Sequence, residues 1–187
     1  MDTQRFKPLT TETMTPEQKQ VADNIMSGPR QGMRGPFNAL LRSPELADHA
    51  QKLGAYVRFK TSIPPKLNEM AILLTARHWT AQYEWYAHHR LAMKAGLSTD
   101  IAAAIAAGKR PASMQTDETV VYEFCHDVLE TGQASDASFK AVVDTFGERG
   151  AIDLIGVMGY YSLVAMTLNV DRVPIPDGGK PPLAALK

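Results

Sequence analysis

The chain has 187 residues and carries 20 basic and 20 acidic side chains, so its formal net charge is zero. A chain of this length can bury the core of one domain without disulfide bonds. The balanced charge gives no electrostatic footprint for nucleic acid or for an anionic membrane. The single cysteine, Cys125, excludes an internal disulfide and a CxxC redox pair. We therefore expect a soluble protein whose partners are neither nucleic acid nor membrane.

Two further features of the sequence bear on where the protein acts. The purely apolar runs, such as residues 101–107, are far shorter than the roughly 20 residues of a membrane helix. Residues 1–14 contain an early acid and lack the apolar segment of a secretory signal. We therefore expect a cytoplasmic protein.

Helix signals dominate the chain from residue 15 onward. The first predicted helix has Thr15 as its N-cap, Pro16 in its first turn and Gly28 after its end. No stretch alternates with a period of two for long enough to predict a strand. The predicted fold is all-α, with one domain over residues 1–187. The predicted helices cover residues 15–28, 43–59, 64–79, 82–96, 98–108, 116–132, 135–147 and 149–170.

Two segments lie outside these helices. The loop at residues 28–42 combines glycines, prolines and three arginines, and a loop of this length in a compact domain is often functional. The alternative is a surface connection in which Phe37, Leu40 and Leu41 only fill the core. The tail at residues 171–187 is rich in proline and glycine, so we expect it to be extended or held against a neighbouring segment.

The predicted helix at residues 82–96 carries an acid and a histidine on one face. Glu84 and His88 are spaced i, i+4, which allows their side chains to meet. The remainder of that face is small or apolar, so we expect it to face other helices, with Arg90 pointing elsewhere. An exposed pair of this kind contributes only a few tenths of a kcal/mol. A partly buried pair would be a plausible proton-transfer couple.

Glu69 lies in the preceding predicted helix among apolar neighbours. If the two helices form an antiparallel hairpin around residues 79–82, Glu69 lies about 15 Å from the turn and faces His88 or the residues beyond it. Alternatively, Glu69 complements the dipole of its own helix. A metal site is not expected, because no second histidine has zinc-type spacing and no cysteine is near.

The run NEMAILLTARHWTAQYEWYAHHRLAMKAGLS, residues 68–98, resembles the core motif of the carboxymuconolactone decarboxylase superfamily, which includes the alkylhydroperoxidase D-like proteins. The resemblance covers residues 64–108, and residues 116–170 supply the C-terminal helices. It implies a helical bundle of the alkylhydroperoxidase D-like type. It also implies a homo-oligomer, a trimer or a hexamer, in which helices of neighbouring subunits close the pocket.

The hydroperoxidase branch of this superfamily has an upstream glutamate, then CxxC, then a histidine. Aligned on His88, the glutamate falls on Glu69 and the two cysteines fall on Ala81 and Glu84, so both thiols are absent. Disulfide-based reduction of peroxide needs a reactive thiolate and a resolving partner. Cys125 lies in another predicted helix, where we expect an inert, half-buried residue.

The decarboxylase branch has Glu-x-x-x-His at the same place, and EWYAH at residues 84–88 fits it. That branch acts on a carboxylated butenolide without a metal or an organic cofactor. The resemblance implies that His88 is the acid/base, that Glu84 is its partner or a second proton carrier, and that Glu69 orients His88.

We therefore expect a cofactor-independent lyase or isomerase that acts on a small carboxylated or lactone-like substrate. Two alternatives stay open: an antioxidant protein that relies on Cys125 alone, and a non-catalytic oligomeric protein that binds a small ligand. For Tyr160 and Tyr161 the alternative is simple helix packing. The candidate substrate-binding residues are Tyr83, Asn38, Arg34, Arg42, Tyr160 and Tyr161.

Overall fold

The computed structural model describes residues 4–29 and 32–185, and within these ranges it contains helices and no strand. The all-α prediction is therefore confirmed. In chain order the α-helices are α1 (Pro16–Ser27), α2 (Phe37–Leu40), α3 (Pro44–Phe59), α4 (Pro65–His78), α5 (Gln82–Lys94), α6 (Thr99–Ala106), α7 (Thr116–Thr131) and α8 (Asp136–Asp171), and a short 3-10 helix follows at Pro176–Gly178.

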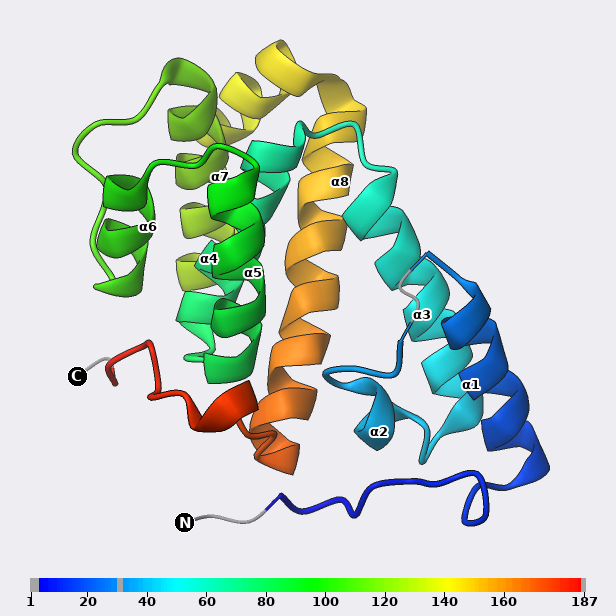
Figure 1. Cartoon of the computed structure of the whole chain (residues 1–187). Helices are drawn as coiled ribbons and strands as arrows, with labels where there is room; N and C mark the ends of the chain where they lie inside the picture. The colour runs from blue at the N-terminus through cyan, green and yellow to red at the C-terminus, as the bar shows by residue number, and fades with distance from the viewer. Residues whose placement is uncertain (1–3, 30–31, 186–187) are drawn as a thin grey trace.

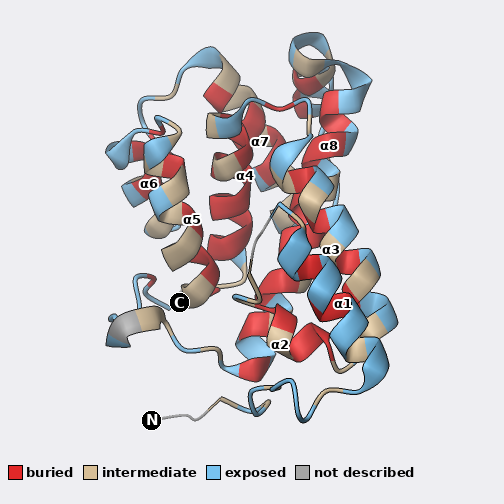
Figure 2. Ribbon diagram, turned by 45° about the vertical axis from the view of Figure 1, so that its right-hand side comes forward, coloured by how far each residue is buried: buried red, intermediate tan, exposed pale blue. Residues whose placement is uncertain are grey.

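Helix α4 lies at the centre of the fold (Figure 1). Every residue from Met70 to Arg77 is buried, because α5, α6, α7 and α8 surround the helix. A helix enclosed in this way is apolar all round, which explains the run MAILLTA in the sequence. Figure 2 shows the buried residues concentrated on α4 and on the inner faces of its neighbours.

Helices α4 and α5 form the predicted antiparallel hairpin. The turn between them has Thr80 in a left-handed conformation, with φ of 48°, and the backbone N–H of Ala81 donates to Ala76 O at 2.8 Å. A positive φ is uncommon outside glycine, so this turn is a defined feature of the chain. It places the first turn of α4 beside the later half of α5.

Helix α8 combines the two helices that the sequence predicts at residues 135–147 and 149–170. The break between them is at Gly147, whose φ of 71° and ψ of 173° are not helical. By length and composition α8 is apolar enough to cross a membrane, but 56% of its most apolar window is buried inside the protein. It packs against α3, α4, α5 and α7 and so forms part of the core of the fold.

A buried carboxylate fixes the end of α3 against α8. Asp153 of α8 accepts hydrogen bonds from Tyr56 Oη at 2.8 Å, from Ser62 N at 2.7 Å and from Ser62 Oγ at 2.8 Å. One turn further along α8, a Cβ added to Gly156 would lie 3.6 Å from Val57 Cγ1, so the two helices approach closely there. These contacts determine the position of the last turn of α3.

Both ends of the chain are tied to the helices. Near the N-terminus, Phe6 N donates to Asp171 Oδ1 at 2.7 Å. In the C-terminal tail, Gln82 Nε2 donates to Leu183 O at 2.7 Å, and Leu183 N donates to Gln82 Oε1 at 2.9 Å. Leu183 itself is buried. The described part of the tail is thus held against a neighbouring segment, as the sequence predicts.

Candidate functional site

Three side chains that the sequence singles out converge at one point between α4 and α5. His88 Nδ1 lies 2.7 Å from Glu69 Oε2, and His88 Nε2 lies 3.0 Å from Glu84 Oε1. Glu84 and His88 are one turn apart on α5, and the hairpin brings Glu69 to them from α4. The imidazole therefore has a carboxylate on each of its ring nitrogens.

This cluster is buried, which decides between the two interpretations of the Glu84–His88 spacing. Glu84 and His88 are each only 4% exposed. Burial alone would lower the pKa of His88, but the charges and hydrogen bonds of Glu84 and Glu69 outweigh it and raise that pKa from 6.5 to about 9. His88 is consequently an imidazolium at neutral pH, and the pair is not an exposed surface ion pair.

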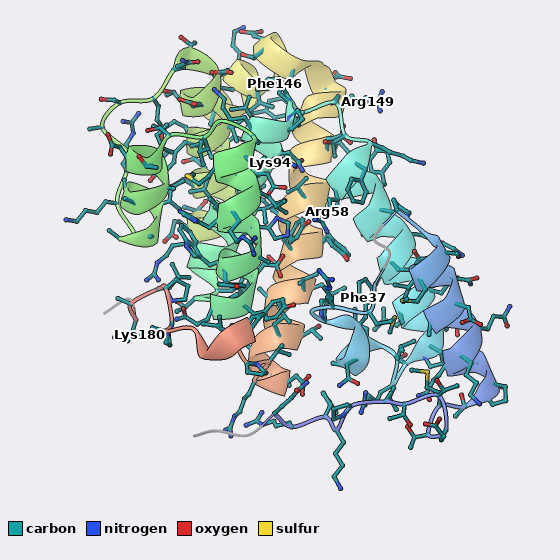
Figure 3. All side chains as sticks on the ribbon, viewed as in Figure 1. Phe37, Arg58, Lys94, Phe146, Arg149 and Lys180 are labelled. Atoms are coloured by element: carbon teal, nitrogen blue, oxygen red, sulfur yellow. The ribbon has the colours of Figure 1, made fainter. Side chains whose placement is uncertain are left out.

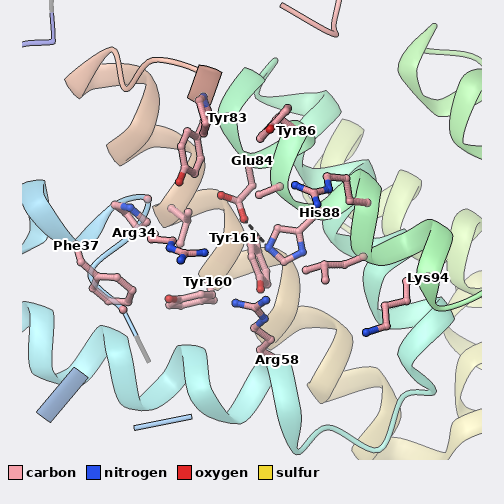
Figure 4. A pocket seen from close by; sticks show the side chains of 18 residues that line it. Arg34, Phe37, Arg58, Tyr83, Glu84, Tyr86, His88, Lys94, Tyr160 and Tyr161 are labelled. Carbon is pink, nitrogen blue, oxygen red and sulfur yellow. Dashed lines mark ion pairs between the residues drawn. The ribbon is translucent and has the colours of Figure 1, made fainter. Parts of the chain in front are cut away.

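Glu84 and His88 lie on the wall of a cavity of about 900 Å³. Helices α3 and α5 each pack on α8, and the cavity opens between them, with residues 32–37 forming a further wall. Figure 4 shows His88 and Glu84 facing this space above Tyr160, Tyr161 and Arg58. Glu69 is not on the wall and stands behind His88.

The second carboxylate oxygen of Glu84 is open to the cavity. In the described residues, the buried side-chain atoms without a hydrogen-bond partner are Arg77 Nε and Tyr161 Oη. Glu84 Oε2 is not one of them, and it makes no hydrogen bond to a described residue. It is therefore accessible, whereas both nitrogens of His88 already have a carboxylate partner.

Positive charge surrounds the acid on the cavity wall. Arg34, Arg58, Arg90 and Lys94 line the cavity, and none of them pairs with an acidic side chain in the described residues. Figure 3 shows Lys94 projecting from α5 and Arg58 from α3, which flank α8. Four cations against one lining carboxylate favour an anionic ligand.

The structure places four of the six candidate substrate-binding residues at the cavity. Arg34 and Tyr83 line it, and burial together with the charge of Glu84 raises the pKa of the Tyr83 hydroxyl. Tyr160 and Tyr161 also line it and are each 2% exposed. The ring of Tyr161 contacts the His88 ring edge-on, with centroids 4.9 Å apart. The described part of the loop at residues 28–42 lines the cavity and also buries Phe37 in the core.

Asn38 and Arg42, which the sequence suggests as substrate-binding residues, do not line the cavity. Asn38 Oδ1 accepts a hydrogen bond from Leu9 N at 2.9 Å. Arg42 donates to the carbonyl oxygens of Asn38 and Lys7, and its guanidinium lies over the ring of Phe6. Both side chains hold the N-terminal segment against α2 and the start of α3.

The sequence does not predict three of the four cationic side chains that line the cavity. Arg90 was expected to point elsewhere, yet it lines the cavity together with Lys94. A signal for both exists, because Tyr83, Ala87, Arg90 and Lys94 are spaced i, i+4, i+7 and i+11, a stripe beside Glu84 and His88. Arg58 gives no such signal, since a basic residue in a last helical turn is equally well explained by the helix dipole.

Two residues near the site in sequence do not belong to it. His89 stacks on Trp85, with ring centroids 6.0 Å apart, and does not line the cavity. Cys125 is completely buried in α7, and this burial raises the pKa of its thiol far above the ordinary value. Cys125 is thus more deeply buried than the half-buried position expected from the sequence.

Within residues 4–29 and 32–185, no group of three or more histidine, cysteine, aspartate or glutamate side chains has the arrangement of a metal site. Comparison with known proteins finds no family model that matches the chain and no curated protein with significant similarity. The arrangement of the site itself therefore carries the functional proposal.

Proposed function

We propose that the protein is a cofactor-independent enzyme that transfers a proton to carbon on a small carboxylated substrate, as a lyase of the carboxymuconolactone decarboxylase type. The observation that carries this proposal is the buried Glu69–His88–Glu84 cluster, which reaches a cationic cavity through Glu84. The cluster supplies a proton, and the surrounding cations attract a carboxylate.

The geometry supports a division of roles that differs from the one implied by the family resemblance. A carboxylate oxygen lies 2.7 Å from Nδ1 of His88 and another lies 3.0 Å from its Nε2, so we assign the contact with the substrate to Glu84 rather than to His88. Glu84 has an accessible oxygen, so Glu84 is the group that contacts the substrate. His88 is the proton reservoir that reprotonates Glu84, and Glu69 holds His88 in place and favours its charged form.

On a carboxylated, unsaturated γ-lactone the reaction proceeds as follows. The bond between the ring carbon and its carboxylate breaks, and carbon dioxide leaves. The electron pair moves through the ring double bond onto the lactone carbonyl oxygen. The electron pair then returns as a ring carbon takes a proton from Glu84, which has itself just received that proton from His88, and solvent finally restores the proton of His88. A His88 pKa of about 9 keeps this reservoir protonated at neutral pH.

The α4–α5 hairpin supports the proposed relationship to the alkylhydroperoxidase D-like bundle. It carries Glu69 on its first helix and the Glu-x-x-x-His pattern on its second, and the three side chains meet. No observation favours the antioxidant alternative, because the Cys125 thiol is inaccessible. The cavity gives a small molecule access to Glu84, which favours a role of the Glu84–His88 pair in chemistry or binding over a role in packing alone.

We also propose that the chain acts in the cytoplasm as a homo-oligomer, a trimer or a hexamer. The surface that supports association is an apolar stripe on α8 flanked by residues of α3. Its large side chains are between 37% and 66% exposed, and they are Ile152, Ile155, Met166, Val170, Leu53 and Tyr56. Exposed apolar patches of this extent mark interfaces. Light scattering on the protein and on an Ile152→Glu variant tests this, and a monomeric wild type would refute it.

The catalytic proposal is tested with carboxymuconolactone and related carboxylated butenolides. Loss of ring absorbance and release of carbon dioxide are followed for the wild type and for the Glu84→Gln and His88→Gln variants. We expect both variants to lose at least about 100-fold in turnover, with unchanged circular dichroism.

His89→Gln is the matched control, because His89 is the adjacent histidine and faces away from the cavity. We expect this variant to retain wild-type turnover. Wild-type turnover in His88→Gln would refute the proposal. Binding of the lactones without any release of carbon dioxide would favour the ligand-binding alternative instead.

A further inference from the structure

Arg58 and Tyr161 approach the same part of the cavity from different helices. Arg58 projects from the last turn of α3, and Tyr161 projects from α8 with its ring in edge-on contact with His88. Figure 4 shows the Arg58 guanidinium beside the Tyr161 ring, on the side of the cavity that faces His88 and Glu84. These two side chains therefore adjoin the Glu84–His88 pair on the cavity wall.

Neither side chain has the partner that its chemistry calls for. Tyr161 Oη is buried without a hydrogen-bond partner, and a buried hydroxyl in that condition costs about 1–3 kcal/mol. Arg58 is half-buried and pairs with no acid in the described residues; its contact is the ring of Phe59, 5.1 Å from the guanidinium carbon. Hydrogen-bond donors left unused beside a reactive group are suited to bind an oxygen of the substrate.

We propose that Arg58 and the hydroxyl of Tyr161 form an oxyanion site that binds the carbonyl oxygen on which negative charge develops. This inference rests on the proposed function and specifies its substrate as an unsaturated acid or lactone whose carbonyl is conjugated to the reacting carbon. The electron pair released by decarboxylation resides on that oxygen, Arg58 and Tyr161 stabilise it, and Glu84 delivers the proton to carbon.

The surroundings strengthen both donors. Fixed donors in a site shielded from water stabilise a developing charge more than donors in water do. Burial raises the pKa of Tyr161 well above its ordinary value, so its hydroxyl keeps its proton as a donor. Tyr161 lines the cavity but its hydroxyl is covered, so binding of the oxyanion there requires a side-chain shift that uncovers it. Arg34, Arg90 and Lys94 are exposed and are suited instead to bind the carboxylate of the incoming substrate.

The experiment uses 4-nitrophenol, whose yellow phenolate is a stable stand-in for the oxyanion. Its absorbance is titrated with the wild-type protein at a pH where half of the free phenol is ionised. We expect wild-type protein to bind the phenolate and increase the ionised fraction. We expect Arg58→Gln and Tyr161→Phe each to weaken phenolate binding about tenfold or more. In the decarboxylation assay, the same two variants should have a lower kcat than the wild type and nearly the same KM.

The matched controls are Arg110→Gln and Tyr122→Phe, which change the same residue types away from the cavity. Both controls should bind phenolate as the wild type does. Absence of phenolate binding by the wild type, or undiminished binding by Arg58→Gln and Tyr161→Phe, would overturn the oxyanion site. Because phenolate binding needs no turnover, an intact phenolate response without lactone decarboxylation would instead overturn the proposed function alone.

Discussion

Replacing Glu69 by glutamine removes one charge from the cluster while leaving its shape nearly unchanged. In the wild type, burial of His88 opposes its charge, and the carboxylates of Glu84 and Glu69 hold its pKa at about 9. The Glu69 carboxylate lies 2.7 Å from the ring nitrogen and behind the cavity wall. The Glu69→Gln variant therefore tests the charge on His88 without altering the surface that meets the substrate.

The size of the effect follows from the shift in pKa. A rise from 6.5 to about 9 corresponds to about 3 kcal/mol of stabilisation of the native state by protonated His88. Because the native pKa is the higher one, this stabilisation is complete below pH 6.5 and is lost as the pH rises through about 9. Removal of one close carboxylate should lower the native pKa by roughly 1–2 units. Protonated His88 should therefore stabilise the native state of the variant less than that of the wild type, and this stabilisation should be lost at a lower pH.

NMR titration of the His88 ring measures the pKa directly, and urea unfolding between pH 6 and 10 measures the linked stability. The control is Glu123→Gln, the same substitution in an exposed ion pair with Arg110. It should leave the His88 titration unchanged. A wild-type His88 that titrates at or below 6.5, or a Glu69→Gln variant with an unshifted pKa, would refute the charge network.

Three further changes test the framework of the site. Gln82→Ala removes both hydrogen bonds to Leu183, so urea unfolding should show a loss of about 1–2 kcal/mol and proteolysis of the tail should accelerate; no difference from the exposed control Gln133→Ala would contradict this. Burial raises the pKa of Asp153, but hydrogen bonds from Ser62 and Tyr56 outweigh burial and lower it. The stabilisation from Asp153 is thus lost as the pH falls through that lowered pKa, and Asp153→Asn, which should cost about 2 kcal/mol, should flatten the acid limb of the stability profile. The Cys125→Ser variant should consume peroxide no more slowly than the wild type, and a slower rate in the variant would revive the antioxidant alternative.

The local parts of the structure could be predicted from the sequence because they depend on short-range chemistry. Thr15 caps α1 in a capping box, and Ser98 caps α6, as their positions in the sequence indicate. The contact between Glu84 and His88 follows from helical spacing. The position of Glu69 follows from the length of a helical hairpin, since the rise per residue fixes which residues face each other across the turn.

The remaining parts depend on contacts between segments far apart in the chain. Asn38 and Arg42 are held by residues 6–9, and no local pattern shows where that N-terminal segment lies. Arg58 reaches the cavity because Asp153 fixes the end of α3 against α8, a contact that joins residues 97 and 91 positions apart. Burial of the Glu84–His88 pair on α5 likewise depends on how α4 and α8 pack against it, because Glu69 and Tyr161 contact His88.

The charges at the cavity also connect substrate binding with acid formation in the proposed mechanism. A chain with zero net charge places four cations around one lining carboxylate, so its field draws anions toward Glu84. An anionic substrate beside Glu84 brings two negative charges together, and transfer of a proton from His88 to Glu84 relieves their repulsion. The proton that His88 shares with Glu84 then shifts toward Glu84, the side that faces the substrate. Binding of the anion itself therefore prepares the acid that the reaction requires.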